Sequence, residues 1–149
     1  MKFNNFLAVF CFLLACNCHA NNTPISFANI DHSLVKLTPK KNAVDVQIEF
    51  HGQLKSQIVT METERDAKVS VDDYNFDGFK DFSVWHLDDG KGTYTIHRIF
   101  VYAPKKGEFN EVFPACSDEF INLRLNKKKK LIISSYQKES TWAICQTKF

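Results

Sequence analysis

Apolar and polar side chains alternate with a period of two along most of this chain. The clearest alternation lies in residues 44–50, and a second run, 54–62, follows after a His-Gly pair. Such alternation is typical of half-buried β-strands, and the short polar interval between the two runs predicts a hairpin. No segment keeps a helical period of 3.6 residues, so the pattern favours an all-β protein.

The same pattern continues to the C-terminus in short runs separated by turn residues. The runs that we expect to form strands are 68–71, 82–87, 94–102, 108–113, 120–125, 131–136 and 141–146. Asp-Gly at 89–90 and the segment 104–107 predict hairpin turns. Residues 43–149 are therefore predicted to form a single antiparallel all-β domain, a meander of hairpins. Before them, 21–42 form a polar segment with an expected edge strand at 33–37.

The first twenty residues are typical of an export signal. Lys2 precedes an apolar run at 6–15 that is too short to span a bilayer comfortably. We expect cleavage after Ala20, so that 1–20 form a signal peptide and the mature protein is periplasmic. The alternative is a bacterial lipobox ending at Cys16, which would leave a lipoprotein anchored to a membrane.

The most specific motif lies between the strands expected at 68–71 and 82–87. Oxygen-bearing side chains stand at 73, 75, 77 and 81, with Gly78 allowing a sharp turn, which matches positions one, three, five, nine and six of a calcium loop. Carboxylates this close repel one another unless a cation lies among them. The predicted ligands of a calcium ion are Asp73, Asn75, Asp77, Phe79 and Asp81. Phe79 would contribute only its backbone carbonyl. The alternative is a metal-free turn rich in Asp and Asn.

This motif differs from the helix–loop–helix EF-hand. Val84 occupies the twelfth position, where the EF-hand needs a bidentate Glu, and both flanking segments alternate as strands. We therefore expect a structural ion at a turn between two strands. With one acidic ligand fewer, the dissociation constant should be on the order of 10⁻⁴ to 10⁻³ M, the range of extracellular calcium modules.

The positions of the cysteines support export. Three of the five Cys precede residue 21, which leaves Cys116 and Cys145. Two thiols in an oxidising compartment usually pair, so we expect a disulfide, with a shared zinc ion as the alternative.

The net charge of the chain does not point to a nucleic-acid partner. The formal net charge is +2, and the basic run at 127–130 is interpreted as a solvated turn between strands.

Motifs for catalysis are missing from the sequence. Ser, His and acidic residues lack the spacing of a nucleophile elbow, and no pair of carboxylates outside 73–81 suggests acid and base roles. His86 and His97 are expected to face each other across a turn, as a structural pair rather than a zinc site. We therefore predict that the protein is not an enzyme.

Several of these segments together resemble a known family. Residues 71–82, an aromatic strand after them, the Pro-Lys-Lys-Gly-Glu-Phe segment at 104–109 and Ile-Ile-Ser-Ser at 132–135 resemble exported propeller-like immunity proteins. Those proteins protect bacteria against lysozyme-like effectors of bacterial-killing type IV secretion systems, and they are similar in shape to periplasmic inhibitors of invertebrate-type lysozyme. The resemblance covers 43–146. It implies a propeller-like fold with bound calcium and a protruding loop that plugs a glycan hydrolase.

The mechanism that the resemblance implies is physical blockage. A lysozyme-like peptidoglycan hydrolase works through carboxylates in a sugar cleft, and a rigid loop that fills the cleft stops it. We expect the plug where the strand at 131–136 ends and leads into 137–140, because a ring there can stack in place of a sugar and a cation can meet the carboxylates. The expected partner contacts are Ser134, Ser135, Tyr136 and Lys138. The alternatives are a solvated hairpin at this place and, for the whole protein, a calcium-stabilised adhesion or carbohydrate-binding module of the integrin-like propeller type.

Overall fold

The computed structural model describes residues 23–149, which form twelve β-strands and no helix. The signal peptide expected at 1–20, with its alternative lipid site at Cys16, lies outside the described residues. The strands are β1 (Ile25–Ala28), β2 (Leu34–Pro39), β3 (Ala43–Phe50), β4 (Gln53–Thr60), β5 (Lys68–Asp72), β6 (Asp81–Leu87), β7 (Thr95–Ala103), β8 (Glu108–Val112), β9 (Phe120–Ile121), β10 (Arg124–Asn126), β11 (Leu131–Lys138) and β12 (Thr141–Thr147). The predicted all-β fold is confirmed. No helix suited to crossing a membrane occurs in this part of the chain.

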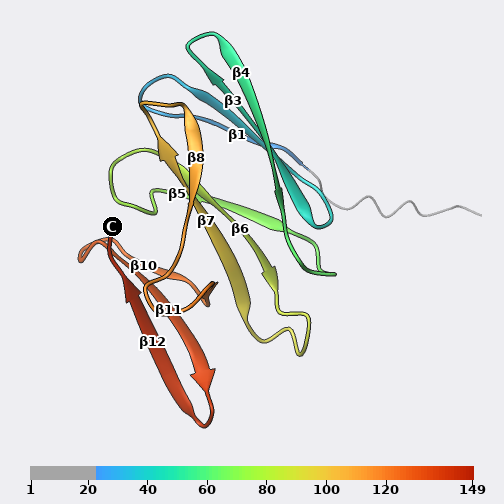
Figure 1. Cartoon of the computed structure of the whole chain (residues 1–149), viewed down its shortest axis with the longest axis vertical. Helices are drawn as coiled ribbons and strands as arrows, with labels where there is room; N and C mark the ends of the chain where they lie inside the picture. Colours follow the sequence, from blue (N-terminus) through green and yellow to red (C-terminus); the bar gives the residue numbers. More distant parts are fainter. Residues whose placement is uncertain (1–22) are drawn as a thin grey trace, which may run out of the picture.

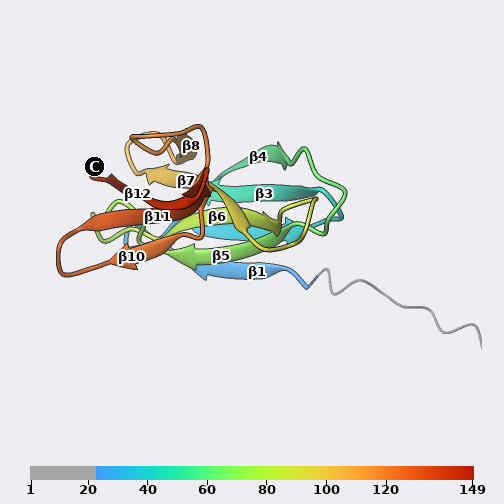
Figure 2. The same ribbon diagram turned by 90° about the horizontal axis from the view of Figure 1, so that it is seen from below.

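The strands form three antiparallel sheets that follow one another along the chain (Figure 1). Sheet one has the order β1-β2-β3-β4, sheet two has β5-β6-β7-β8 with β9 also pairing with β7, and sheet three has β10-β11-β12. Strands that are consecutive in sequence pair with each other in every sheet, so each sheet is a meander of hairpins. In the two views, sheet two lies between sheets one and three (Figures 1 and 2).

Strand β2 lies inside sheet one, where it pairs with β1 on one side and with β3 on the other. The expectation of an edge strand at 33–37 is therefore wrong, and so is a domain boundary at residue 43. Val35 and Leu37 are 2% and 0% exposed because they line the same core as the apolar residues of β3. The alternation predicted the strand itself, but a period of two does not show whether a strand pairs on one side or on both.

Two hydrophobic cores lie on opposite faces of sheet two. Phe82 and Val84 of β6 belong to the first core, between sheets one and two, and Ile99 of β7 belongs to the second, between sheets two and three. Because both faces of sheet two are covered, β6 is buried at almost every position, including the polar Asp81 and Ser83. Sheet two is thus the centre of the fold, and sheet three is attached to it through the smaller core.

Candidate functional site

The predicted calcium loop joins β5 to β6, as expected, and the pair Asp72 and Asp81 closes it at the sheet. Phe76 and Gly78 both have left-handed backbone angles, with φ of 63° and 94°. Glycine adopts such an angle at no steric cost, which explains its place at the sharpest bend. The sequence motif therefore forms a tight turn between adjacent strands.

Side-chain oxygens near the start of this turn accept its backbone amides. The Asp77 amide donates to Asp73 Oδ1 and to Asn75 Oδ1, both at 3.1 Å. The Gly78 amide donates to Asp73 Oδ2 at 2.9 Å, and the Phe79 amide donates to Asp77 Oδ1 at 2.9 Å. Asn75 Nδ2 also donates to Asp77 Oδ2 at 2.8 Å. Three of the predicted ligand side chains consequently gather on one side of the turn.

Asp81, the fourth predicted side-chain ligand, is fully buried and hydrogen-bonded to backbone. Its Oδ2 accepts the amides of Tyr74 and Asn75 at 2.8 and 3.3 Å, and its Oδ1 accepts the Tyr102 amide of β7 at 2.8 Å. Burial raises the pKa of Asp81 to about 7; the three amides oppose this rise, and the charge of Asp77 adds to it. Asp81 therefore fastens the turn to the next strand of the sheet.

The turn has the oxygen ligands that a hard cation prefers, but its side chains alone do not complete a coordination sphere. Within residues 23–149, no three carboxylate, imidazole or thiol groups lie close enough together to hold a metal ion by themselves. A calcium ion at this turn would need Asp73, Asn75 and Asp77 together with main-chain and water oxygens, which is feasible because a carboxylate oxygen accepts more than one interaction. Coordination by Asp81 and by the Phe79 carbonyl stays a prediction.

The second predicted site lies on the β11–β12 hairpin, which projects from the body of the protein (Figure 1). Strand β11 continues to Lys138, and only Glu139 and Ser140 separate it from β12. The strand expected to end at residue 136 thus runs two residues further, and the expected plug lies in a paired hairpin, which fits the alternative of a solvated hairpin. Its contact with a hydrolase stays a prediction. A hairpin that extends beyond the core can keep pairing while polar on both faces, so its composition resembles that of a loop.

The four expected partner contacts do not form one surface. Ser134 is 1% exposed and pairs with Cys145 on the inner face, so its predicted role as a contact is wrong. Tyr136 and Lys138 lie on that same face nearer the tip, and Ser135 lies on the opposite face, since alternate residues of a strand point to opposite sides. Tyr136 and Ser135 are half-buried, and Lys138 is exposed.

The outer face of the hairpin carries two exposed apolar side chains that the sequence analysis did not select. Trp142 is 68% exposed and Ile144 is 66% exposed. They share this face with Ser135, which pairs with Ile144. A signal for them existed in the sequence. A disulfide at Cys145 places that residue on the inner face, so the residues one and three positions before it must point outward.

A groove of about 490 Å³ lies on this outer face, lined by Thr95, Asn122, Leu123, Arg124, Ser135 and Trp142. Asn122 accepts the Thr95 amide at 3.1 Å and donates to the Ser135 carbonyl at 3.0 Å, so it connects sheets two and three. Arg124 is exposed and forms no ion pair within the described part of the chain. The groove thus combines a guanidinium, hydroxyl groups and an indole.

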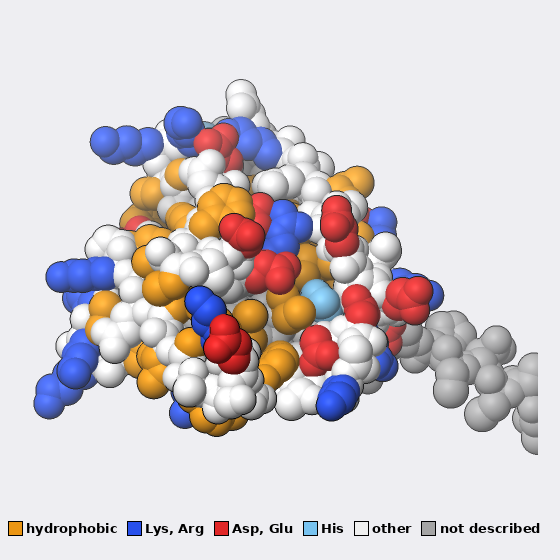
Figure 3. All heavy atoms as spheres, turned by 60° about the horizontal axis from the view of Figure 1, so that its bottom comes forward, with side chains coloured by type: hydrophobic (Ala, Val, Ile, Leu, Met, Phe, Trp, Pro, Cys, Tyr) orange, Lys and Arg blue, Asp and Glu red, His pale blue; other side chains and the backbone are white. Residues whose placement is uncertain are grey.

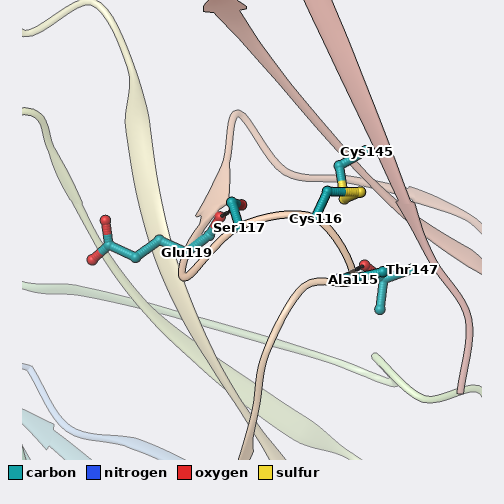
Figure 4. Close-up of a disulfide and its surroundings, with 6 residues drawn as sticks. All are labelled: Ala115, Cys116, Ser117, Glu119, Cys145 and Thr147. Atoms are coloured by element: carbon teal, nitrogen blue, oxygen red, sulfur yellow. Dashed lines mark hydrogen bonds between the residues drawn. A yellow bond between two sulfur atoms is a disulfide. The ribbon is translucent and has the colours of Figure 1, made fainter.

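The predicted disulfide is present and anchors the hairpin. Cys116 and Cys145 are bonded, with their Cα atoms 5.8 Å apart. Figure 4 shows that Cys116 lies in the segment leading to β9, beside β12. Next to it, the Ala115 amide donates to Thr147 Oγ1 at 3.0 Å. These two links fix the C-terminal half of β12 against the body of the protein.

Charge is divided unevenly between the sheets. Residues 122–149, which contain sheet three, have seven basic side chains and one acidic one, a net charge of +6, whereas 23–121 have eleven basic and sixteen acidic ones, a net charge of −5. Lys and Arg side chains accordingly project from the left side in Figure 3, while Asp and Glu gather toward its centre and right. The basic run at 127–130 is an exposed turn, as expected, and Lys127 pairs with Asp72 at 2.9 Å.

The two histidines expected to face each other do not. His97 pairs with Trp85 and His86 pairs with Ile96, so the two imidazoles lie on opposite faces of sheet two. Burial, with a smaller contribution from His86, lowers the pKa of His97 to about 4. His97 also stacks on Trp85, with ring centroids 5.6 Å apart, which makes it part of the packing of the sheet.

The strongest candidate site is therefore the outer face of sheet three, defined by Arg124, Ser135, Trp142 and Ile144. It carries the exposed side chains of Arg124, Trp142 and Ile144 and is held by a disulfide, whereas the turn at 73–81 is largely occupied by its own hydrogen bonds. Comparison with known proteins finds no family model, curated protein or solved structure that matches this chain.

Proposed function

We propose that this protein is an exported immunity protein that inhibits a lysozyme-like peptidoglycan hydrolase, such as an effector of a bacterial-killing type IV secretion system. The observation that carries the proposal is the joint presence of a net charge of +6 and an exposed indole on one projecting sheet. A lysozyme-like enzyme presents carboxylates in a sugar-binding cleft. Sheet three complements both properties of such a cleft.

The outer face of sheet three supplies the contacts in this proposal. The Trp142 ring stacks where the hydrolase would hold a sugar ring, and the Arg124 guanidinium pairs with a cleft carboxylate. Trp and Arg are the residues that most often dominate binding energy at protein interfaces. Because the Cys145 disulfide and Asn122 hold the sheet in place, little ordering free energy is lost on binding. Tyr136 and Lys138 lie on the opposite face of the hairpin, so in this proposal they meet the hydrolase only where the tip itself enters the cleft.

A calcium ion at the turn 73–81 has a structural role in this proposal. The turn lies next to sheet three, because Lys127 of that sheet pairs with Asp72 at the base of the turn. An ion bound by Asp73, Asn75 and Asp77 would reduce the repulsion between the two carboxylates and stiffen the turn. It would therefore help to hold the position of sheet three without touching the hydrolase.

Inhibition of cell-wall lysis tests the proposal. Purified protein with its disulfide intact is added to turbid peptidoglycan together with a panel of lysozyme types, including a type IV secretion effector. We expect stoichiometric inhibition of at least one enzyme, and a loss of at least tenfold in potency for Arg124→Ala/Trp142→Ala. The control is Leu54→Ala/Arg65→Ala, in which Leu54 is as exposed as Trp142, at 68%, but lies on sheet one. Lack of inhibition across the panel at tenfold excess would overturn the proposal.

A carbohydrate-binding or adhesion module is the second candidate function. The groove of about 490 Å³ beside Trp142 favours it, because an aromatic ring next to hydroxyl groups of Thr95 and Ser135 is suited to a sugar. A glycan array separates the two functions. Binding of a glycan by wild type, its loss in Trp142→Ala, and no effect on any hydrolase would favour the module over the inhibitor.

A further inference from the structure

Sheet three ends at β12, and the outer edge of β12 has no strand beside it. Within residues 23–149, β12 pairs with β11 alone, and no other backbone hydrogen bond reaches it. The two-residue turn makes Lys138 and Thr141 a hydrogen-bonded pair. Because such pairs alternate with non-hydrogen-bonded ones in an antiparallel ladder, the backbone N–H and C=O groups of Trp142, Ile144 and Gln146 point away from β11.

This edge lacks the features that normally protect a strand from pairing. Proteins shield edges by making them short or by placing charges or proline in them. Strands β1 and β10 have only four and three residues, β4 contains Lys55, β5 begins with Lys68, and β8 begins with Glu108. Strand β12 has seven residues, Thr-Trp-Ala-Ile-Cys-Gln-Thr, with no charge, proline or glycine. It is therefore the edge of this molecule that is best suited to receive another strand.

Charge indicates which strand would fit there. A second copy of this chain would bring two sheets with a net charge of +6 each into contact, and that repulsion opposes self-pairing. Lys138 lies at one end of β12, across from Thr141, and Lys148 follows its other end. Both ends of the edge would attract carboxylates on an added strand, whose apolar residues would lie beside Trp142 and Ile144.

We propose that β12 binds an extended acidic segment of a protein partner by strand addition, which lengthens sheet three by one strand. Backbone hydrogen bonds from Trp142, Ile144 and Gln146 give the affinity in this mode, and side-chain pockets and charge give the specificity. The inference goes beyond the proposed function, because it concerns how a partner is recognised and not what the partner does.

Amide hydrogen exchange of the protein, measured with and without added synthetic peptides, tests the inference, and no hydrolase is needed. The probe is the peptide Glu-Val-Glu-Val-Glu-Val-Glu, and its controls are the same peptide with Lys in place of Glu and an acidic peptide N-methylated at alternate residues. In the free protein we expect fast exchange of the Trp142, Ile144 and Gln146 amides. The acidic probe should slow these three amides at least tenfold, and neither control should. If the acidic peptide gives no protection, strand addition is excluded, but the proposed inhibition of a hydrolase is unaffected, because the lysis assay tests it separately.

A matched pair of variants isolates the backbone contribution. Ile144→Pro removes an outward N–H without breaking the β11 ladder, which edge strands tolerate, while Ile144→Thr removes apolar surface and keeps the N–H. We expect the proline variant to lose protection by the probe and the threonine variant to keep it within a few-fold. Equal protection in both variants, no protection by any peptide, or protection that grows with protein concentration alone would overturn the inference. Should the proline variant fail to fold, the N-methylated peptide decides.

Discussion

The turn at 73–81 and the β11–β12 hairpin treat their polar groups in opposite ways. In the turn, side-chain oxygens accept the loop's own amides, and buried Asp81 alone accepts three. On the hairpin, the amides on the outer edge of β12 have no partner in the described chain, and Trp142 is 68% exposed. The amides of the turn are hydrogen-bonded within the protein, whereas the amides and the indole on the outer side of the hairpin remain available to a partner.

This difference indicates that the turn has a structural role and that the hairpin has a role in recognition. A buried polar group that is fully hydrogen-bonded specifies one conformation and has little left to offer a partner. An exposed aromatic ring, an unpaired guanidinium and an open strand edge contribute little to folding and are the groups that interfaces use most. The motif that is most specific in sequence is thus mainly a clamp of the fold, and the surface suited to binding lies in sheet three.

The largest effect is expected for Asp81→Ala. The substitution leaves the buried amides of Tyr74 and Tyr102 without an acceptor, which should lower the free energy of unfolding by roughly 3 to 5 kcal/mol. Urea denaturation followed by near-UV circular dichroism measures it. The matched control, Asp66→Ala, changes an exposed carboxylate and should stay within about 0.5 kcal/mol. A loss below about 1 kcal/mol for Asp81→Ala would show that the clamp is not structural.

Removing the disulfide should have the next largest effect. Cys116 and Cys145 are 29 residues apart, and the double Ser variant should lose about 3 to 4 kcal/mol of unfolding free energy in the chain-entropy model. The loss should be local as well, with amide exchange in β12 accelerating more than in β3. Identical denaturation curves with and without reductant would contradict the view that this bond braces the hairpin.

Alternation in the sequence predicted the strands well because burial follows it directly. The run at 44–50 became β3, and the Asp-rich segment became the turn between β5 and β6. A period of two shows which residues share a face, but it does not show whether anything covers that face. The disulfide at Cys145 indicates that Trp142 and Ile144 point outward, but only the arrangement of the three sheets shows that nothing covers that face.

The net charge of the whole chain does not show how charge is distributed between its sheets. The whole chain has a formal net charge of +2, which points to no nucleic acid but conceals that 122–149 carry +6 and 23–121 carry −5. The polar residues at 137–140 left open whether the tip is a loop or a solvated hairpin. Such residues are compatible with a projecting hairpin, whose two faces both meet water.

The pH dependence of stability should expose the burial of Asp81. In the metal-free protein its pKa is raised from 3.8 to about 7, so Asp81 stabilises the fold at low pH and loses that contribution as pH rises toward 7. His97, with its pKa lowered from 6.5 to about 4, acts in the opposite direction, since its contribution is lost as pH falls below 6.5. The two slopes partly cancel in wild type.

The variant His97→Gln removes this cancellation. With chelator present, it should be more stable at pH 5 than at pH 7.5 by on the order of 2 kcal/mol, and equilibrium denaturation at the two values measures the difference. Asp81→Asn/His97→Gln is the control, and its profile should be nearly flat. A stability of His97→Gln that rises with pH would contradict the assignment of the buried charge to Asp81.

Calcium should stabilise the turn by a smaller amount. At ten times the dissociation constant, an ion that binds only the folded state adds about 1.4 kcal/mol, or roughly 4 °C in melting temperature. We expect this rise in wild type and not in Asp77→Ala, while Asp66→Ala should keep it, and differential scanning fluorimetry measures all three. A wild-type melting curve that is the same in chelator and in excess calcium would remove the ion from this turn.

The smallest effect on stability is expected for Trp142→Ala, although its effect on binding should be large. Trp142 is 68% exposed and pairs only with Gln137 across the hairpin, so its loss should change the free energy of unfolding by no more than about 0.5 kcal/mol. Phe82→Ala, in the core of sheet two at 0% exposure, should by contrast cost about 3 to 5 kcal/mol. Urea denaturation of both variants gives the comparison. A loss above about 2 kcal/mol for Trp142→Ala would mean that the indole supports the fold, and the contrast between a self-satisfied turn and an open hairpin would no longer hold.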